Sequence, residues 1–274
     1  MAHQHLSCEH IVVNHGDHQV LNDVSIDISP GKRTAILGAN GSGKTTLMRA
    51  LSGAIKPKSG HVLVDGVPLK YNSKGLNAHR SVVQLVLQNP DDQLFSADVY
   101  RDVSFGPVNQ GLSEEDARAR VEEALALMGV THLAERPTHQ LSYGERKRVA
   151  CAGAVAMRPC ILMLDEPTAG MDPDAVSEML AALERLEAAN TTVAMSTHDL
   201  DMILTWADRA IIVLDKQTIV GDPVDLLSDE ELINRTRLQI PWPLKLAKRL
   251  ADAGKVDPSW RPRSLDDVSA LLCK

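Results

Sequence analysis

Short apolar runs bounded by turn residues recur along the chain and predict strands that alternate with helices. The runs typical of strands are 8–13, 24–28, 33–37, 61–65, 81–87, 160–166 and 191–196. A polar turn around Gly16-Asp17 joins the first two, and 208–214 with 218–220 fits a closing hairpin. Strands alternating with helices indicate an α/β protein whose mostly parallel sheet is covered on both faces.

Helical periodicity dominates between about residues 89 and 158. Ser113 is a fitting N-cap, the three acids after it suit a first helical turn, and Gly129 is a natural stop. Between them, one face collects the apolar residues Ala117, Val121, Leu125 and Met128. Residues 89–158 are therefore expected to form a helical insertion between two strand-rich parts.

Composition narrows the class of protein. The chain has 274 residues, 44% hydrophobic and 24% charged, which suits one large or two small globular domains. The net charge of -7 and the 3% of aromatic residues argue against a nucleic-acid binder. No apolar run is long enough to span a bilayer, and residues 1–5 lack a signal pattern. The scattered cysteines predict free thiols of a cytosolic protein: Cys8, Cys151, Cys160 and Cys273.

Residues 38–45 (GANGSGKT) match the phosphate loop G-x-x-x-x-G-K-[ST], between an apolar run and the start of a helix. Glycines let successive N–H groups point at an anion, and the helix N-terminus favours negative charge. Lys44 is expected to reach the β- and γ-phosphates, and the Thr45 hydroxyl to ligate Mg²⁺. The alternative is a glycine-rich turn that binds nothing. The predicted ATP contacts are Gly38, Asn40, Gly41, Ser42, Gly43, Lys44, Thr45 and Thr46.

Two carboxylates follow the apolar run 161–164. Asp165 is expected to hold Mg²⁺ beside Thr45, and Glu166 is the candidate base that polarises the attacking water. Such a pair could also be a helix cap, but the phosphate loop favours catalysis.

Three further segments narrow the function. Ser142 and Gly144 open a helical run and offer a second anion site, which makes sense if it serves a phosphate held by another subunit. His198 ends a strand, where it could sense the γ-phosphate, although a lone histidine is usually structural. Gln88 also ends a strand and could touch metal, water or a neighbouring protein.

This combination resembles the nucleotide-binding subunits of ATP-binding-cassette (ABC) transporters over about residues 8–223. Residues 38–45 resemble Walker A, ILMLDE Walker B, and LSYGE the signature, here Ser142, Gly144 and Glu145. Gln88, His198 and Asp172 match the Q-loop, the switch histidine and the D-loop. The resemblance implies a P-loop NTPase with a RecA-like core, an antiparallel β subdomain and a helical signature subdomain. It also implies a head-to-tail dimer in which each ATP contacts the other chain's signature.

A subfamily follows from QNPDDQLF at 88–95 and DVSFGP at 102–107, which are similar to the energy-coupling-factor type. That type powers uptake of vitamins or of cobalt and nickel ions, and a cobalt or nickel system with one kind of ATPase fits best. The resemblance implies a nucleotide-binding domain at 1–225 and a dimerising helical extension at 226–274. Expected partners are a second ATPase subunit, with a homodimer favoured over a heterodimer, a transmembrane coupling subunit and a substrate-binding membrane component, at the cytoplasmic face of the membrane. Expected cofactors are ATP and Mg²⁺.

Three positions depart from the family pattern. Tyr143 replaces the second signature glycine, and the Lys216-Gln217 turn lacks its usual glycine. The aromatic residue that stacks on adenine is absent, and His15 or Asn14 falls near its place.

Two regions and one rival function stay open. Residues 235–263 carry eight basic and two acidic residues, which indicates a packed appendage or dimer contact rather than a membrane-binding patch. The histidines near the start are interpreted as surface residues: His3, His5, His10, His15 and His18. The rival to transport is a soluble ABC ATPase of a cofactor-assembly machine. The 89–95 loop discriminates between the transporter subunit and the soluble ATPase, since in a transporter its apolar tip should dock on a membrane subunit.

Overall fold

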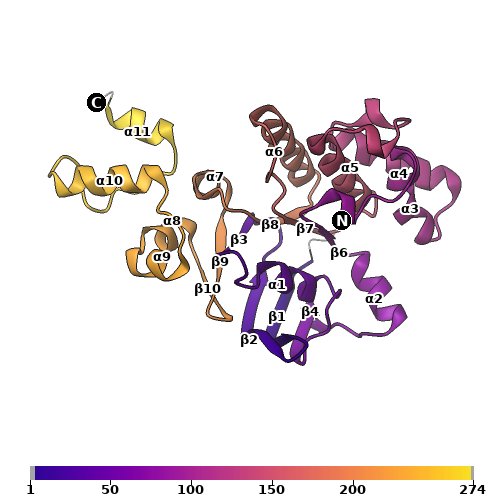
Figure 1. The fold of residues 1–274 in the computed structure, drawn as a ribbon, viewed down its shortest axis with the longest axis horizontal. Coiled ribbons are helices and arrows are strands. Elements are labelled where there is room, and N and C mark those ends of the chain that lie inside the picture. The colour runs from indigo at the N-terminus through magenta and orange to yellow at the C-terminus, as the bar shows by residue number, and fades with distance from the viewer. Residues whose placement is uncertain (1–3, 273–274) are drawn as a thin grey trace.

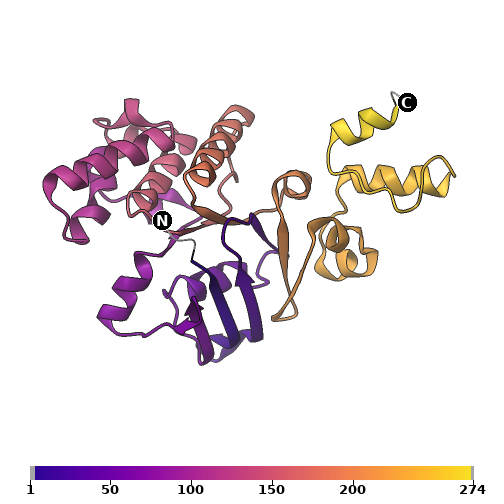
Figure 2. The ribbon, with the colours of Figure 1, turned by 180° about the vertical axis from the view of Figure 1, so that it is seen from behind.

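The computed structural model describes residues 4–272, so His3 and Cys273 lie outside the described residues. Two sheets organise the described chain, with helices on both sides of the larger sheet and further helices at the C-terminal end (Figure 1). Seen from behind, the helical part at 89–158 and the C-terminal helices lie at opposite ends of the molecule (Figure 2).

The larger sheet has the order β10-β9-β3-β8-β7-β6. Its strands from β9 to β6 run parallel, and only β10 is antiparallel. The bounds are β3 Thr34–Leu37, β6 Val83–Val86, β7 Ile161–Asp165, β8 Thr192–Ser196, β9 Arg209–Leu214 and β10 Gln217–Gly221. The predicted parallel sheet and closing hairpin are thereby confirmed.

The smaller sheet is antiparallel, in the order β2-β1-β4-β5, and forms the β subdomain. Its strands are β1 Leu6–His15, β2 His18–Ile28, β4 Ser59–Val64 and β5 Val67–Pro68. The β1–β2 turn lies at Gly16-Asp17, as the pattern predicts, with His15 paired to His18. Strand β2 begins before the apolar run at 24–28. The run does not mark the first half of the strand, because that half is polar on one face.

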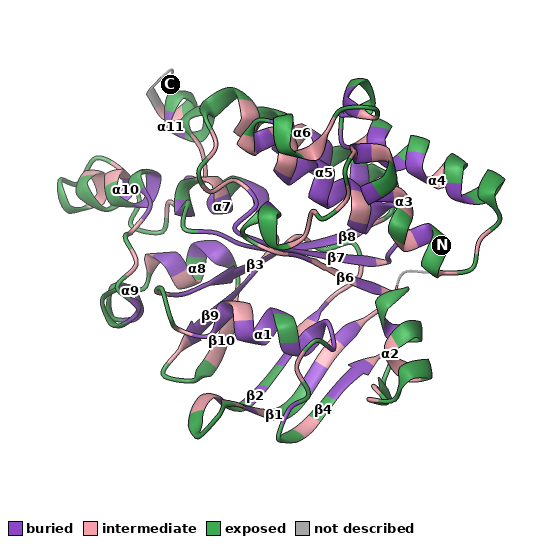
Figure 3. Cartoon of the chain, turned by 45° about the vertical axis from the view of Figure 1, so that its right-hand side comes forward, coloured by how far each residue is buried: buried purple, intermediate pink, exposed green. Residues whose placement is uncertain are grey.

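Both faces of the larger sheet are buried (Figure 3). Leu162 and Leu164 face the helices, whereas Ile161 and Met163 face the β subdomain and α1 (Lys44–Leu51). The alternation follows from the two-residue period of a strand, in which successive side chains point to opposite faces. Every residue of β7 is therefore buried, and its carboxyl end delivers Asp165 to the edge of the sheet.

Residues 89–158 form the predicted helical subdomain. It comprises η1 Pro90–Asp92, α3 Val99–Asn109, α4 Glu114–Leu127, η2 Thr131–Leu133, η3 Thr138–Gln140 and α5 Tyr143–Val155. Ser113 caps α4 as predicted, its hydroxyl accepting from the Asp116 N–H at 3.1 Å. Helix α6 (Pro173–Ala188) packs beside α5 and starts at Asp172, whose carboxylate caps it.

Two helices have no counterpart in the sequence pattern. Helix α2 (Ser73–Arg80) has a single buried residue, His79, and so shows no apolar stripe. Helix α7 (Leu200–Trp206) is too short to establish a period.

The C-terminal helices are α8 Pro223–Ser228, α9 Glu230–Thr236, α10 Trp242–Asp252 and α11 Leu265–Leu272. Leu232, Ile233 and Leu244 bury into the helical-side core, and Arg263 pairs with Asp222 at 3.0 Å. The predicted domain boundary at residue 225 falls inside α8. Within residues 4–272, no helix is long and apolar enough to cross a membrane.

Candidate functional site

The phosphate loop is built around a glycine whose backbone other residues rarely adopt. Gly38 has a φ of 144°, and a Cβ there would lie 2.6 Å from both Ser42 Oγ and the Val213 carbonyl oxygen. The loop therefore needs glycine for both conformation and space. Behind it, Gly43 precedes α1, whose N-terminus faces the loop.

Lys44 lies under the loop rather than in solvent. Its Nζ donates to the carbonyl oxygens of Gly38 at 2.9 Å and Ala39 at 3.3 Å. Burial lowers the pKa of Lys44, while the nearby carboxylates of Glu166 and Asp165 act in the opposite direction. The loop thus holds a buried ammonium against its own backbone.

A cavity of about 580 Å³ opens in front of this loop. It gathers segments far apart in the sequence, including the predicted residues of four separate motifs. These lining residues are His15, Asn40, Gly41, Ser42, Gly43, Lys44, Thr45, Thr46, Gln88, Glu166 and His198. The fold therefore brings the phosphate loop, Gln88, the carboxylate strand end and His198 together as predicted.

Thr45 and Asp165 meet at the edge of the cavity. The Thr45 hydroxyl donates to Asp165 Oδ2 at 2.6 Å, and the Ser196 hydroxyl donates to Asp165 Oδ1, also at 2.6 Å. Hydroxyl, carboxylate and amide oxygens, the last from Gln88, are the donors that Mg²⁺ prefers. Ser196 is a positioning residue that the sequence analysis missed, although it ends the strand beside β7.

Glu166 is buried and strained. Its φ is 50°, in the left-handed region that side chains other than glycine rarely adopt. Burial raises the pKa of Glu166, against the lowering effect of His198, Lys44 and Lys147. His198 Nε2 lies 2.9 Å from Glu166 Oε1, and the His198 side chain is 46% exposed. Because His198 is half-exposed and lines the cavity, it can contact a molecule bound there and Glu166 at the same time.

One buried oxygen of the cavity, Ser42 Oγ, has no hydrogen-bond partner among the described residues. Buried polar atoms are nearly always satisfied, so an oxygen left open at a cavity fits a polar occupant there. The phosphate loop, the oxygen donors and this atom together fit a nucleotide triphosphate with its magnesium ion.

His15 lies where the sequence places a base-stacking residue. It ends β1 beside the phosphate loop, lines the cavity, and has its Nε2 3.1 Å from Thr46 Oγ1. Asn14, the other candidate, does not line the cavity. The arrangement supports a contact from the His15 ring to a bound nucleotide.

The signature segment lies outside this cavity. Ser142 is the exposed N-cap of α5, with Glu145 Oε2 accepting from the Ser142 N–H at 2.7 Å. This hydrogen bond lowers the pKa of Glu145. Neither Ser142 nor Gly144 lines the cavity, so the second predicted anion site lies outside the first. The carboxylate of Asp172 accepts from the Ala175 N–H at 2.8 Å and likewise stays outside.

The structure adds to the cavity a turn that the sequence analysis noted only for its missing glycine. Asp215 and Lys216, between β9 and β10, line the cavity, and both have positive φ. Without the usual glycine the turn is strained, and the Asn22 N–H holds it by donating to the Lys216 carbonyl oxygen at 2.7 Å.

No resident metal cluster accompanies the cavity: between residues 4 and 272, no group of three or more His, Cys, Asp or Glu side chains could hold a metal ion. The early histidines His10, His15 and His18 are exposed and His5 is half-buried, in agreement with their interpretation as surface residues.

Comparisons with known proteins agree with this geometry. Residues 21–169 match the family model described as ABC transporter. The chain is 45% identical to the cobalt import ATP-binding protein CbiO of Rhodobacter capsulatus over 259 residues, 94% of this chain and 92% of that protein. It is 42% identical to the energy-coupling factor transporter ATP-binding protein EcfA3 of Clostridium perfringens over 239 residues, 86% and 84% of the two chains. The solved structure of cbiO1 from Clostridium perfringens, titled as part of the ABC transporter complex cbiONQ, gives a TM-score of 0.75 at 40% identity, over 89% of this chain and 98% of that one.

Proposed function

Because the chain belongs to the ABC transporter ATP-binding family, whose members hydrolyse ATP to power transport, we propose that it drives uptake of cobalt or nickel ions through an energy-coupling-factor transporter. The observation that carries the proposal is the cavity itself. It contains one half of a nucleotide site, with loop, strand-end carboxylate and His198, while the signature residues stay on another face.

Each residue of the cavity has a role that its position supports. The backbone N–H groups of residues 40–45 and the Lys44 ammonium bind the phosphates. Glu166, with its raised pKa, accepts a proton from the attacking water, which suits a base that must work near neutral pH. His198 orients Glu166 and contacts the γ-phosphate. His15 lies against the adenine ring of the nucleotide.

Thr45, Asp165 and Gln88 are proposed to hold Mg²⁺. The ion, when bound, neutralises charge on the β- and γ-phosphates. Thr45 and Asp165 already lie within hydrogen-bond distance, and Ser196 fixes the orientation of the Asp165 carboxylate.

The exposed signature supports a dimer of two copies. Ser142, Gly144 and Glu145 lie at the N-terminus of α5, which favours an anion, and none of the three lines the cavity. A second copy, placed head to tail, would bring its own phosphate loop to this face, with Asp172 beside it. Dimer closure then completes each site.

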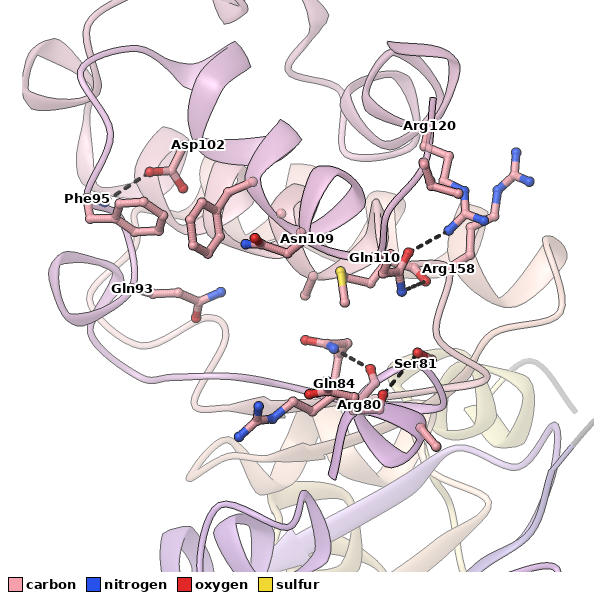
Figure 4. A pocket seen from close by; sticks show the side chains of 18 residues that line it. Arg80, Ser81, Gln84, Gln93, Phe95, Asp102, Asn109, Gln110, Arg120 and Arg158 are labelled. Carbon is pink, nitrogen blue, oxygen red and sulfur yellow. Dashed lines mark hydrogen bonds between the residues drawn. The ribbon is translucent and has the colours of Figure 1, made fainter. Parts of the chain in front are cut away.

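A separate groove of about 1250 Å³ is proposed to receive a membrane subunit, which would place the chain at the cytoplasmic face of the membrane. Gln93, Asn109 and Gln110 face Arg80 and Gln84 across it (Figure 4). Two exposed rings stand at its edge, Phe95 at 63% and Phe105 at 54%, with centroids 4.7 Å apart. Asp102 accepts from the N–H groups of Phe95 and Ser96, which fixes the apolar tip of the loop.

Exposed neighbouring aromatic rings above a polar groove suit a docking helix with one apolar side. The loop that carries Phe95 begins at Gln88, so an occupant of the groove lies a few residues from the proposed nucleotide site. The rival, a soluble cofactor-assembly ATPase, gives no reason for a fixed apolar tip.

Co-purification tests the transport role. Phe95→Asp is expected to abolish recovery of a membrane subunit in mild detergent, with ATP binding unchanged. Val67→Asp is the matched control, because Val67 is 65% exposed on the β subdomain, away from the groove. If both variants still recover the membrane subunit, or if both lose it, docking at Phe95 is contradicted.

Uptake measurements test the cargo. Cells that carry the transporter should accumulate labelled cobalt or nickel, and Glu166→Gln should stop it. The vitamin-type alternative is favoured instead if a vitamin, and neither metal, is accumulated in a Glu166-dependent way. The relative named for cobalt import supports the metal alternative, whereas the name of the energy-coupling factor relative supports the type of transporter and names no cargo.

A further inference from the structure

Lys147 is a buried cation that none of the motif assignments uses. It lies in α5, directly after the signature segment, and only 3% of the residue is exposed. Its ammonium leaves the helical subdomain and reaches the segment that follows β7. There Nζ donates to the carbonyl oxygens of Glu166 at 2.5 Å and Ala169 at 3.1 Å.

The Glu166 backbone needs such support. A φ of 50° at a glutamate is strained and persists only where the surroundings fix it. On the amide side, the Glu166 N–H donates to Ser196, with the carbonyl oxygen at 3.2 Å and Oγ at 3.0 Å. On the carbonyl side, the only side chain described as donating to Glu166 is Lys147. The peptide that orients the proposed base is therefore held from two different elements.

Lys147 is buried beside two carboxylates and an aromatic ring. Burial lowers the pKa of Lys147, while Glu166 and Asp165 act in the opposite direction. The Tyr143 ring lies 5.4 Å from Nζ, within the range of a cation–π contact. An ammonium has three donors, and two are used on carbonyl oxygens.

Tyr143 closes the other end of the same segment. A Cβ at Gly170 would lie 3.2 Å from Tyr143 Cε1, so the ring packs directly on the backbone of a glycine with a φ of 76°. The first two turns of α5 thus contact the chain at Glu166, at Ala169 and at Gly170. Any shift of α5 relative to the sheet must pull on the backbone of Glu166.

We propose that Lys147 is a positioning residue for ATP hydrolysis, which fixes the Glu166 main chain and links its orientation to the helix that carries the signature. Lys147 touches neither the cavity nor a reacting atom, so it acts through Glu166. The inference rests on the proposed role of Glu166 as base. The proposal predicts that the rate of ATP hydrolysis and the position of the helical subdomain both depend on the Lys147 ammonium.

The test compares Lys147→Met with the unchanged chain, using full-length protein and Mg-ATP. Met keeps the length of the side chain but removes the donors. We expect kcat to fall about 10- to 100-fold, as for other displaced catalytic groups, with KM and ATP affinity within about threefold. Lys147→Arg, which restores a cation with several donors, should recover a large part of kcat. Arg118→Met, which removes an exposed cation from α4, should leave both constants unchanged.

Three results would overturn the proposal. They are an unchanged kcat in Lys147→Met, a loss of kcat and ATP affinity in parallel, or equal losses in the Met and Arg variants. If Lys147→Met does not fold, as judged by circular dichroism, Lys147→Gln takes its place in the same comparison. Glu166→Gln, measured alongside, separates the role of Glu166 from that of Lys147. If Glu166→Gln still turns over ATP, the assignment of Glu166 as base fails. If Glu166→Gln loses turnover while Lys147→Met has normal kinetics, only the role of Lys147 is removed.

Discussion

Thr45 and Asp165, which are 120 residues apart in sequence, lie 2.6 Å apart through the Thr45 hydroxyl and Asp165 Oδ2. One ends the phosphate loop and the other ends β7. The contact therefore connects the phosphate loop to the end of β7. Glu166, the proposed base, follows directly after that strand end.

Glu166→Gln tests the base. The amide keeps the shape of the side chain but cannot take a proton, so turnover should drop about 100- to 10,000-fold while ATP still binds. Size-exclusion chromatography with ATP should then show a trapped dimer. Phosphate release at the unmodified rate would remove Glu166 from this role.

Lys44→Ala should weaken nucleotide binding. The substitution removes an ammonium that would form charge-assisted hydrogen bonds, worth about 1.5–3 kcal/mol, which corresponds to roughly a 10- to 150-fold loss of affinity. Equilibrium titration with a fluorescent ATP analogue measures it. Lys74→Ala, on the exposed face of α2, is the control, and equal affinity in both variants would contradict the assignment.

Mixing two inactive variants tests the shared site. Ser142→Asp keeps a good N-cap for α5 but repels a phosphate, and Lys44→Ala disables the phosphate loop. A dimer with one chain of each kind contains one intact pair of loop and signature. Statistical mixing in a two-fold dimer should therefore restore about a quarter of normal turnover. No recovery in the mixture, when each variant is folded, argues against sites shared between copies.

Gly38→Ala should destabilise the phosphate loop. The added Cβ would meet Ser42 Oγ and the Val213 carbonyl oxygen at 2.6 Å, in a backbone conformation that costs about 1–3 kcal/mol outside glycine. Denaturant unfolding and ATP titration should both show the loss. Gly31→Ala is matched to it, because Gly31 also has positive φ but nothing within 4 Å of the added atom. A larger loss at Gly31 would contradict the steric account.

The buried thiols should resist alkylation. Burial raises the pKa of both Cys8 and Cys151 to about 12, so at pH 8 almost no reactive thiolate forms at either position. Peptide mass spectrometry after iodoacetamide should find them unmodified in folded protein and modified after unfolding in urea. Rapid labelling of either thiol without urea would show that it is not buried.

Much of this arrangement follows from local sequence signals. The phosphate loop, the apolar run of β7 and the Ser113 cap are read directly because each depends on residues close in sequence. The ABC family and the energy-coupling-factor relatives were also predicted correctly. By contrast, α2 and α7 lack the length or the apolar period that would reveal a helix.

The missed site residues share one cause, which is distance along the chain. Ser196, Lys147 and Lys216 act through contacts with segments far away, and none stands in a pattern that marks it. Lys147 looks like an ordinary helix lysine until its Nζ is seen beside the Glu166 carbonyl oxygen. Only the three-dimensional arrangement supplies those partners.

Strand β7 also limits which changes of length the chain can accept. Its first four residues alternate between two cores, and its last residue is the carboxylate that meets Thr45. Deletion of one residue would move Glu166 into the place of Asp165 and exchange the two faces of the strand. Insertions and deletions among homologues should therefore collect in turns such as Gly16-Asp17, while the interval from β7 to Glu166 keeps a constant length.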